Sequence, residues 1–124
     1  MVSIEPTGDQ VRQLRDLDHE GPIVMLNLLK FKPDGGAQLY DRYSSVAGRL
    51  VVEIGGRILY YGTQMMPVIG HEEWDAALLV QYPSRNAFLA MIADERYRGA
   101  ARYRHEALID SRLYALATID SPRR

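Results

Sequence analysis

The chain has 124 residues, of which 47% are hydrophobic and 25% charged, with a formal net charge of −1 and no cysteine. This length predicts one domain with its own core, and the near-neutral charge gives no field that attracts nucleic acid or an anionic membrane surface. The lack of cysteine excludes disulfides, thiolate metal sites and a cysteine nucleophile. Because there is no signal-peptide pattern and no apolar stretch of the ~20 residues that span a bilayer, we expect a cytoplasmic protein without membrane contact.

The sequence predicts an N-terminal helical extension over residues 1–20, followed by a folded domain over residues 21–120. Within the extension, capping residues around Thr7 precede a narrow apolar stripe at helical spacing that comprises Val11, Leu14 and Leu17. We therefore expect a short helix over about residues 8–17, docked on the domain through this stripe.

The next stretch, residues 23–31, reads I-V-M-L-N-L-L-K-F. Its brevity and its β-branched residues favour a strand. Both alternating sets of side chains are apolar, which is typical of a strand covered on both faces and placed inside a sheet. We assign the set with Met25, Asn27, Leu29 and Phe31 to the face that the helices leave open, and we expect a second copy of the chain to cover that face.

The remaining elements alternate between strand and helix patterns. In chain order they are a turn over 32–36, an amphipathic helix over 39–54 ended by Gly55-Gly56, strands over 57–66 and 74–82, a helix after Ser84, a second helical stretch over 97–108 beyond Asp94, a strand over 110–119 and a frayed tail over 121–124. This order predicts an α+β fold of the ferredoxin-like βαββαβ type, with a four-stranded antiparallel sheet and helices on one face. We expect the first and last strands to lie in its middle.

Three classes of protein share this topology and differ in what covers the open face of the sheet. An RNA-recognition domain carries a glycine- and aromatic-rich signature on its third strand, which W-D-A-A-L-L-V-Q-Y lacks, so nucleic acid is not an expected partner. A small regulatory ligand-binding module is normally joined to a second domain, which we do not expect in a chain of this length. A homodimer that closes two open faces into a barrel around an apolar cavity fits best, because a bare apolar face of this size is a liability.

Several short motifs run through the chain in a fixed order: G-P-I-V-M-L-N-L-L-K-F, Tyr40 and Tyr43, Gly55-Gly56-Arg57, W-D followed by Q-Y-P-S, Tyr97, and Arg104 ahead of A-L-I-D-S-R-L. Together they resemble the DUF1330 family over roughly residues 21–119. The resemblance implies a dimeric α+β barrel, and the N-terminal helix looks like the extension of a longer subgroup. Relatives in this superfamily include cofactor-free monooxygenases, haem proteins, isomerases and stress-responsive proteins, so the resemblance leaves the activity open.

Three polar side chains in apolar surroundings are candidates for ligand contacts. Asn27 must find hydrogen-bond partners, because burying an unpaired carboxamide costs ~1–3 kcal/mol; it either orients a ligand carbonyl or oxyanion, or bonds to a neighbouring side chain or water. Arg104, which the resemblance matches to the family's last helical segment, either binds a carboxylate or pairs with an acid such as Glu106, Asp110 or one on the partner subunit. Arg112 lies on the expected cavity face and needs an acid from the protein or from a ligand.

Three aromatic residues, Tyr43, Tyr60 and Trp74, are expected to shape the same pocket. The neighbouring run of His71, Glu72 and Glu73 lacks a metal-ligand spacing, so we expect no metal. We expect no cofactor either, because the glycine pairs lack the context of a phosphate-cradling loop.

These features predict a protein that binds or converts an apolar or aromatic small molecule with one polar handle. The catalytic version is a cofactor-independent enzyme, monooxygenase-like or isomerase-like; the alternative is a non-catalytic small-molecule-binding or stress-related dimer. A titratable group with a perturbed pKa beside Asn27 favours the enzyme, whereas a pocket of neutral groups favours the binder.

Overall fold

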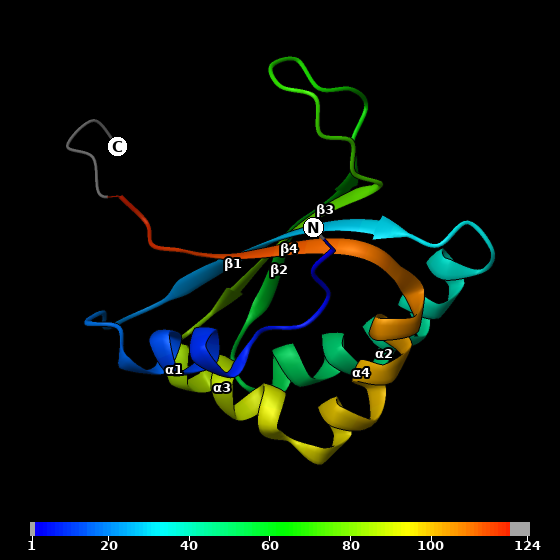
Figure 1. Ribbon diagram of the computed structural model, residues 1–124. Coiled ribbons are helices and arrows are strands. Elements are labelled where there is room, and N and C mark those ends of the chain that lie inside the picture. Colours follow the sequence, from blue (N-terminus) through cyan, green and yellow to red (C-terminus); the bar gives the residue numbers. More distant parts are fainter. Residues whose placement is uncertain (1, 120–124) are drawn as a thin grey trace.

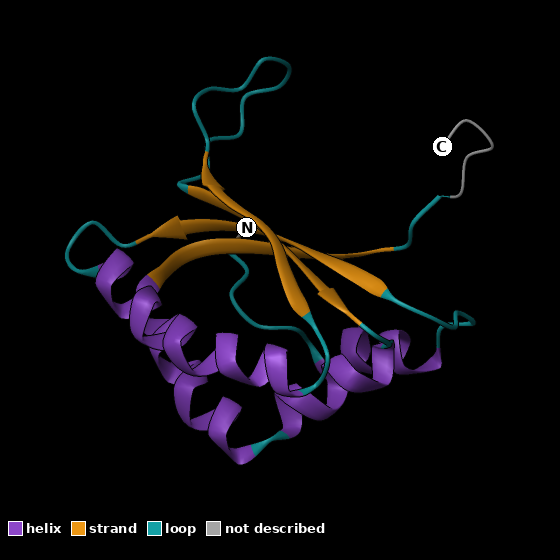
Figure 2. Ribbon diagram, turned by 180° about the vertical axis from the view of Figure 1, so that it is seen from behind, coloured by secondary structure: helices purple, strands orange, loops and turns teal. Residues whose placement is uncertain are grey.

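A computed structural model describes residues 2–119 and contains one four-stranded antiparallel sheet with its helices gathered on one face (Figures 1 and 2). The elements are α1 (Gly8–Asp16), β1 (Ile23–Phe31), α2 (Gly36–Glu53), β2 (Arg57–Thr63), β3 (Ala76–Tyr82), α3 (Arg85–Ala93), α4 (Glu95–Ala107) and β4 (Leu108–Leu116). The predicted ferredoxin-like α+β fold is confirmed. The tail expected over residues 121–124 lies outside the described residues.

The strand order of the sheet is β2-β3-β1-β4. β1 pairs with β3 on one side and with β4 on the other, both antiparallel. The prediction that the first strand is central is therefore correct, but the prediction for the last strand is wrong, because β4 forms an edge. The β2–β3 hairpin occupies one side of β1, which leaves β4 the outer position on the other side.

The two faces of β1 are the reverse of the sequence assignment. Met25 and Leu29 are 2% and 0% exposed, and Asn27 is buried beside them, facing the helices. Leu26 and Leu28, between them, are only half-buried and face the open side. Alternation alone did not resolve this, because both sets are apolar; the packing of α2 against the sheet decides it.

Side chains from all four strands make up the open face of the sheet, which no described helix covers (Figure 2). The register places Val24 opposite Leu116, Leu26 opposite Tyr114 and Leu28 opposite Arg112. On β2, Tyr60 lies opposite Leu79 and is 55% exposed. The open face is therefore a largely apolar surface, as expected, although Met25, Leu29 and Asn27 do not belong to it.

α1 lies in the helix layer beside α3 and does not roof the open face (Figure 1). A capping box between Thr7 and Gln10 starts the helix. The guanidinium of Arg85 on α3 donates to the carbonyl oxygens of Leu14 and His19, each at 3.0 Å. The predicted helical extension thus exists, and polar contacts as well as its apolar stripe dock it.

The segment that precedes α1 runs along β4. The amide of Ser3 donates to Asp110 Oδ1 at 2.8 Å, and Ser111 Oγ donates to the Ser3 carbonyl at 2.6 Å. The hydrogen bond from the Ser3 amide is the main reason why the pKa of Asp110 lies below its ordinary value. This segment therefore packs along β4, the edge strand of the sheet.

The hairpin strands are shorter than predicted, because β2 ends at Thr63 and β3 begins at Ala76. Beyond Thr63, the side chain of Gln64 takes over the cross-links: its Nε2 donates to the Glu72 carbonyl at 3.1 Å, and its Oε1 accepts from the Trp74 amide at 2.9 Å. Side-chain bonding replaces the ladder here, a substitution that hydrophobic patterning does not detect.

Glycines and caps set the helix boundaries. α2 begins earlier than predicted, at Gly36, where a Cβ atom would lie 2.7 Å from the Ala107 carbonyl oxygen. Ser84 and Asp94 cap α3 and α4, and Asp94 divides the two as predicted. Among the helices of residues 2–119, none has the length and apolar character to cross a membrane.

Candidate functional site: a pocket between α2 and the sheet

A small pocket of about 60 Å³ lies between α2 and the helix-facing side of the sheet; we call it the α2 pocket. Its main lining residues are Asn27 from β1, Tyr40, Tyr43, Ser44 and Gly48 from α2, Ile58 from β2, and Leu78 and Tyr82 from β3. Ile58, on the edge strand, is 53% exposed. The pocket therefore opens to solvent between α2 and β2.

Asn27 supplies the most polar part of the pocket wall. Its Nδ2 donates to the carbonyl oxygens of Met25 and Leu78 at 3.5 and 3.4 Å, which is long for an N–H···O bond. Because both neighbours are acceptors, the amide nitrogen must face them, and Oδ1 makes no hydrogen bond to any described residue. This leaves a carbonyl oxygen free to accept a hydrogen bond beside the pocket.

Three tyrosines, Tyr40, Tyr43 and Tyr82, line the pocket together with Asn27. Tyr43 shares a 3.0 Å hydrogen bond between its hydroxyl and that of Tyr97, and the rings of Tyr40 and Tyr43 are 5.2 Å apart. Burial raises the pKa of Tyr40, Tyr43 and Tyr82 above the ordinary tyrosine value. All three therefore remain neutral phenols near pH 7 and do not act as bases there.

The pocket lining contains no aspartate, glutamate, histidine, lysine or arginine side chain. In the part of the chain that the structure describes, no three histidine or carboxylate side chains gather to hold a metal ion either. The arrangement can therefore bind by shape, apolar contact and hydrogen bonds, but it has no group whose charge changes near neutral pH.

Arg104 lies behind Tyr40, outside the pocket lining. Its charge opposes the effect of burial on the Tyr40 pKa, and its Nη1 donates to the Ile4 carbonyl at 2.5 Å. It forms no ion pair within residues 2–119, so neither Glu106 nor Asp110 is the partner that the sequence suggested. A backbone carbonyl of the N-terminal segment takes that place.

The other three sequence candidates lie on the open side of the sheet. The Arg112 guanidinium stands 5.1 Å from the centre of the Trp74 ring and pairs with Asp110 at 2.7 Å. Tyr60 occupies the same face of β2. The structure thus brings Asn27 and Tyr43 together at one site and places Tyr60, Trp74 and Arg112 on the opposite face, so these residues do not line one chamber.

Sequence reasoning missed Tyr40, Ser44, Gly48 and Tyr82 as lining residues. One signal was available on α2, where Tyr40, Ser44 and Gly48 recur at intervals of four and so share one helix face. Glycine has no Cβ atom and serine has a short side chain, so this part of the helix face leaves room between α2 and the sheet. Tyr82 carried no such signal, because only the pairing of β3 with β1 brings it to this site.

Comparisons with known proteins agree with the fold. The model of DUF1330, a domain of unknown function, matches residues 35–117. The RPA0582 protein of unknown function from Rhodopseudomonas palustris is 36% identical, with 98% of this chain and 100% of that chain covered and a TM-score of 0.91. No curated protein matches.

Two more distant structures share the fold alone. A candidate antibiotic biosynthesis monooxygenase from Caulobacter crescentus is 18% identical over 82% of this chain and 92% of its own, with a TM-score of 0.61. A dimeric ferredoxin-like protein of unknown function from Thermobifida fusca is 15% identical over 83% and 96%, with a TM-score of 0.59.

Proposed function

The chain belongs to the DUF1330 family, and we propose that it is a homodimer that binds a small, uncharged, largely apolar molecule in the α2 pocket. The observation that carries this proposal is the free Oδ1 of Asn27 in a pocket otherwise lined by apolar and neutral groups. No buried side-chain nitrogen or oxygen of the described residues lacks a hydrogen-bond partner, so this Oδ1 is reached by solvent through the pocket. A ligand N–H or O–H can take the place of water as its donor.

The polar handle of the ligand is then an N–H or O–H group. The Nδ2 atom of Asn27 is already directed at two backbone carbonyls, so the amide offers its oxygen rather than its nitrogen. The rings of Tyr40, Tyr43 and Tyr82 supply flat surface for an aromatic or apolar body. A charged ligand is disfavoured, because the lining holds no opposite charge.

The size of the pocket limits what it can enclose. Its volume of about 60 Å³ is well below the ~300–1,000 Å³ of sites that bury drug-sized ligands. The donor group and the atoms next to it fit inside, and the rest of the molecule extends past Gly48 and Ile58 toward solvent. This favours compact molecules such as single-ring phenols or anilines.

The neutral lining favours binding over catalysis. A cofactor-independent enzyme, whether monooxygenase-like or isomerase-like, needs a group that moves a proton near pH 7. Burial instead raises the pKa of the pocket tyrosines Tyr40, Tyr43 and Tyr82, so these side chains stay neutral near pH 7. If the protein converts a bound phenol or aniline, the assay described next would detect the product. The catalytic proposal would then replace the binding proposal.

Ligand-observed NMR with phenol and aniline as probes tests the site. Anisole and N,N-dimethylaniline serve as matched probes without a donor. We expect phenol and aniline to bind more tightly than their donor-free partners. Asn27→Ala should weaken their binding three- to tenfold, the range of one lost hydrogen bond. The exposed Asn86 on α3 provides the control variant, Asn86→Ala. Equal binding of all four probes, or equal effects of the two variants, would remove Asn27 from the site.

The open face supports the homodimer. Exposed or half-buried apolar side chains, including Leu26, Tyr60 and Tyr114, cover it without a partner in the protomer. Two such sheets pack ~10 Å apart when they meet face to face. Light scattering should give twice the monomer mass of 14.1 kDa at micromolar concentration. A mass of 14.1 kDa would refute the dimer and leave the ligand proposal standing.

A further inference from the structure

We infer that residues 64–75, which connect β2 and β3, form an arm whose apolar tip packs against the second copy in the dimer. This inference rests on the proposed homodimer and adds to it a specific contact that the sheet faces alone do not supply. Figures 1 and 2 show the arm standing away from the sheet on the side opposite the helices, which is the side of the open face.

The tip of the arm is apolar and has nothing to pack against in its own protomer. Met65, Val68 and Ile69 are 95%, 86% and 96% exposed, and Met66 is 64% exposed. Singly exposed apolar residues are ordinary, but four within five positions form a continuous patch that marks an interaction site. The arm stands on the open side of the sheet, which is the side from which the proposed second copy approaches.

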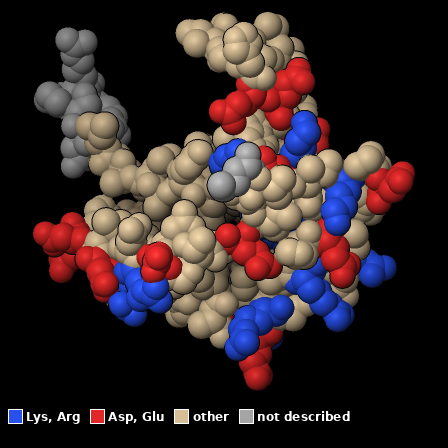
Figure 3. All heavy atoms as spheres, in the orientation of Figure 1, with Lys and Arg blue, Asp and Glu red and all other residues tan. Residues whose placement is uncertain are grey.

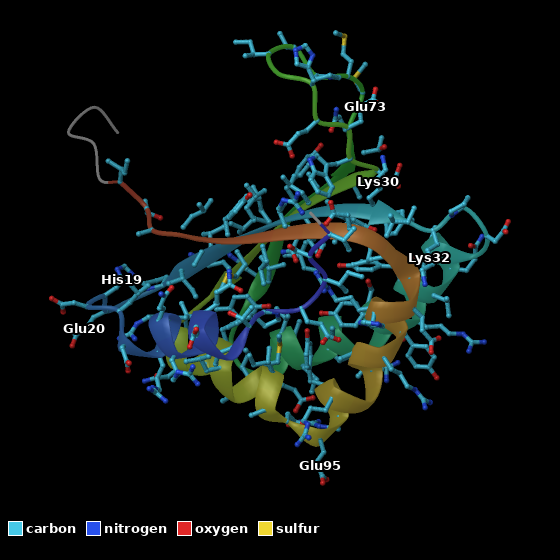
Figure 4. All side chains as sticks on the ribbon, viewed as in Figure 1. His19, Glu20, Lys30, Lys32, Glu73 and Glu95 are labelled. Carbon is cyan, nitrogen blue, oxygen red and sulfur yellow. The ribbon has the colours of Figure 1, made fainter. Side chains whose placement is uncertain are left out.

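The base of the arm is braced. Gln64 links both limbs through the Glu72 carbonyl and the Trp74 amide, and Lys30 Nζ donates to the Glu73 carbonyl at 3.4 Å (Figure 4). A braced arm loses little conformational entropy when it meets a partner, so little of the binding free energy of its tip is needed to order the loop. The arm is therefore positioned before the second copy arrives.

The reach of the arm exceeds the gap between packed sheets. From Thr63 to Val68 the chain spans at most ~16 Å when extended, whereas two packed sheets lie ~10 Å apart. An arm that rises from one sheet is therefore long enough to reach the plane of the other sheet. In the proposed dimer the arm lies along the rim of the second copy, where its tip covers part of that copy's edge.

Charge favours a second copy over a membrane. Carboxylates and basic side chains lie together at the base of the arm (Figure 3), so the arm does not present the basic cluster that binds an anionic lipid surface. Glu73 forms no ion pair with a described residue, and neither does Arg57 at the far end of β2, which is bound only to Gln81 Oε1 at 3.1 Å. A second copy in the opposite orientation brings its Arg57 end toward the carboxylates of the arm, which supports this occupant.

The absence of cysteine from the chain makes a direct test possible. Ile69→Cys carries the only thiol, to which a benzophenone maleimide is attached. Mixed dimers of ¹⁵N-labelled and unlabelled chains are irradiated, and the cross-linked peptides are identified by mass spectrometry. We expect cross-links that join one labelled and one unlabelled peptide. Cross-links confined to one isotope within the same chain would overturn the inference.

A second measurement compares dimer dissociation by analytical ultracentrifugation. Val68→Ser with Ile69→Ser should raise the dimer Kd at least tenfold, whereas Val52→Ser, at a 70% exposed position on α2, should leave it unchanged. If the native chain dimerises and the arm variant has the same Kd, the arm inference fails while the dimer stands. If the arm variant keeps its Kd but loses co-sedimentation with phosphatidylserine vesicles, the tip binds lipid and the inference is likewise overturned.

Discussion

Gly48 offers the sharpest test of the α2 pocket, because the helix gives no structural reason for a glycine at that position. Its φ is not in the left-handed region, and a Cβ atom there would meet no atom within 4 Å. A glycine inside a helix costs ~0.5–1 kcal/mol relative to alanine. The protomer therefore gives up stability to keep this space open at the rim of the pocket.

Two substitutions at this position separate stability from binding. Gly48→Ala should raise the unfolding free energy by about 1 kcal/mol, which corresponds to about 4 °C in Tm for a domain of this size. Gly48→Leu should fold with near-native stability but fill the mouth of the pocket and abolish phenol binding. Thermal unfolding by calorimetry and ligand-observed NMR measure the two effects on the same samples.

Gly99 on α4 provides the matched control, because a Cβ atom there also meets nothing within 4 Å and the position lies outside the pocket lining. Gly99→Ala should give the same stabilisation, and Gly99→Leu should leave phenol binding intact. The reasoning is refuted if Gly48→Ala destabilises the protein by 1 kcal/mol or more, because the space would then be filled, or if Gly48→Leu still binds phenol with native affinity.

Three further substitutions test the packing and the electrostatics of the fold. Gly36→Ala should lower the unfolding free energy by about 2 kcal/mol in chemical denaturation, because the new Cβ would lie 2.7 Å from the Ala107 carbonyl oxygen; native stability would contradict this close approach. The hydrogen bond from Ser3 lowers the folded-state pKa of Asp110, so the ionised carboxylate stabilises the fold above the ordinary pKa of 3.8, and this stabilisation is lost as pH falls below that value. In Asp110→Asn the free energy of unfolding should therefore decline less steeply with acid. An unchanged slope would exclude this contribution. Burial raises the folded-state pKa of Tyr43, so the neutral phenol stabilises the fold below pH 10, and this stabilisation declines at higher pH. Tyr43→Phe should therefore lose less stability in alkaline solution than the native chain. An equal loss would mean that another group is responsible for the alkaline destabilisation.

Local patterns in the sequence were sufficient for the order and type of the elements. Ser84 marked the start of α3 and Asp94 the break after it, and Gly55, with φ of 86°, followed the end of α2 as predicted. These signals lie within a few residues of the structure that they determine. The helical stripe of α1 was recognised for the same reason, although its docking through Arg85 depends on a residue 70 positions away.

The errors arose where the deciding contact is distant in sequence. Both sets of side chains on β1 are apolar, so the pattern left the choice of face to α2, whose buried Tyr40 packs with Leu29. The partner of Arg104 is a backbone carbonyl of Ile4, and a carbonyl has no signature in the sequence. For the same reason the pocket could not be predicted, because Asn27 and Leu78 come together only through the β1–β3 register.

The corrected faces of β1 separate two roles that a single chamber would have combined. Asn27 points toward α2, while its neighbours Leu26 and Leu28 point toward the open face. The residues that line the α2 pocket belong to α2, α3 and the helix-facing side of the sheet. In the proposed homodimer, the second copy covers the opposite side of the same strand. The proposed ligand site and the proposed dimer contact therefore lie on opposite faces of β1, and each can be tested without the other.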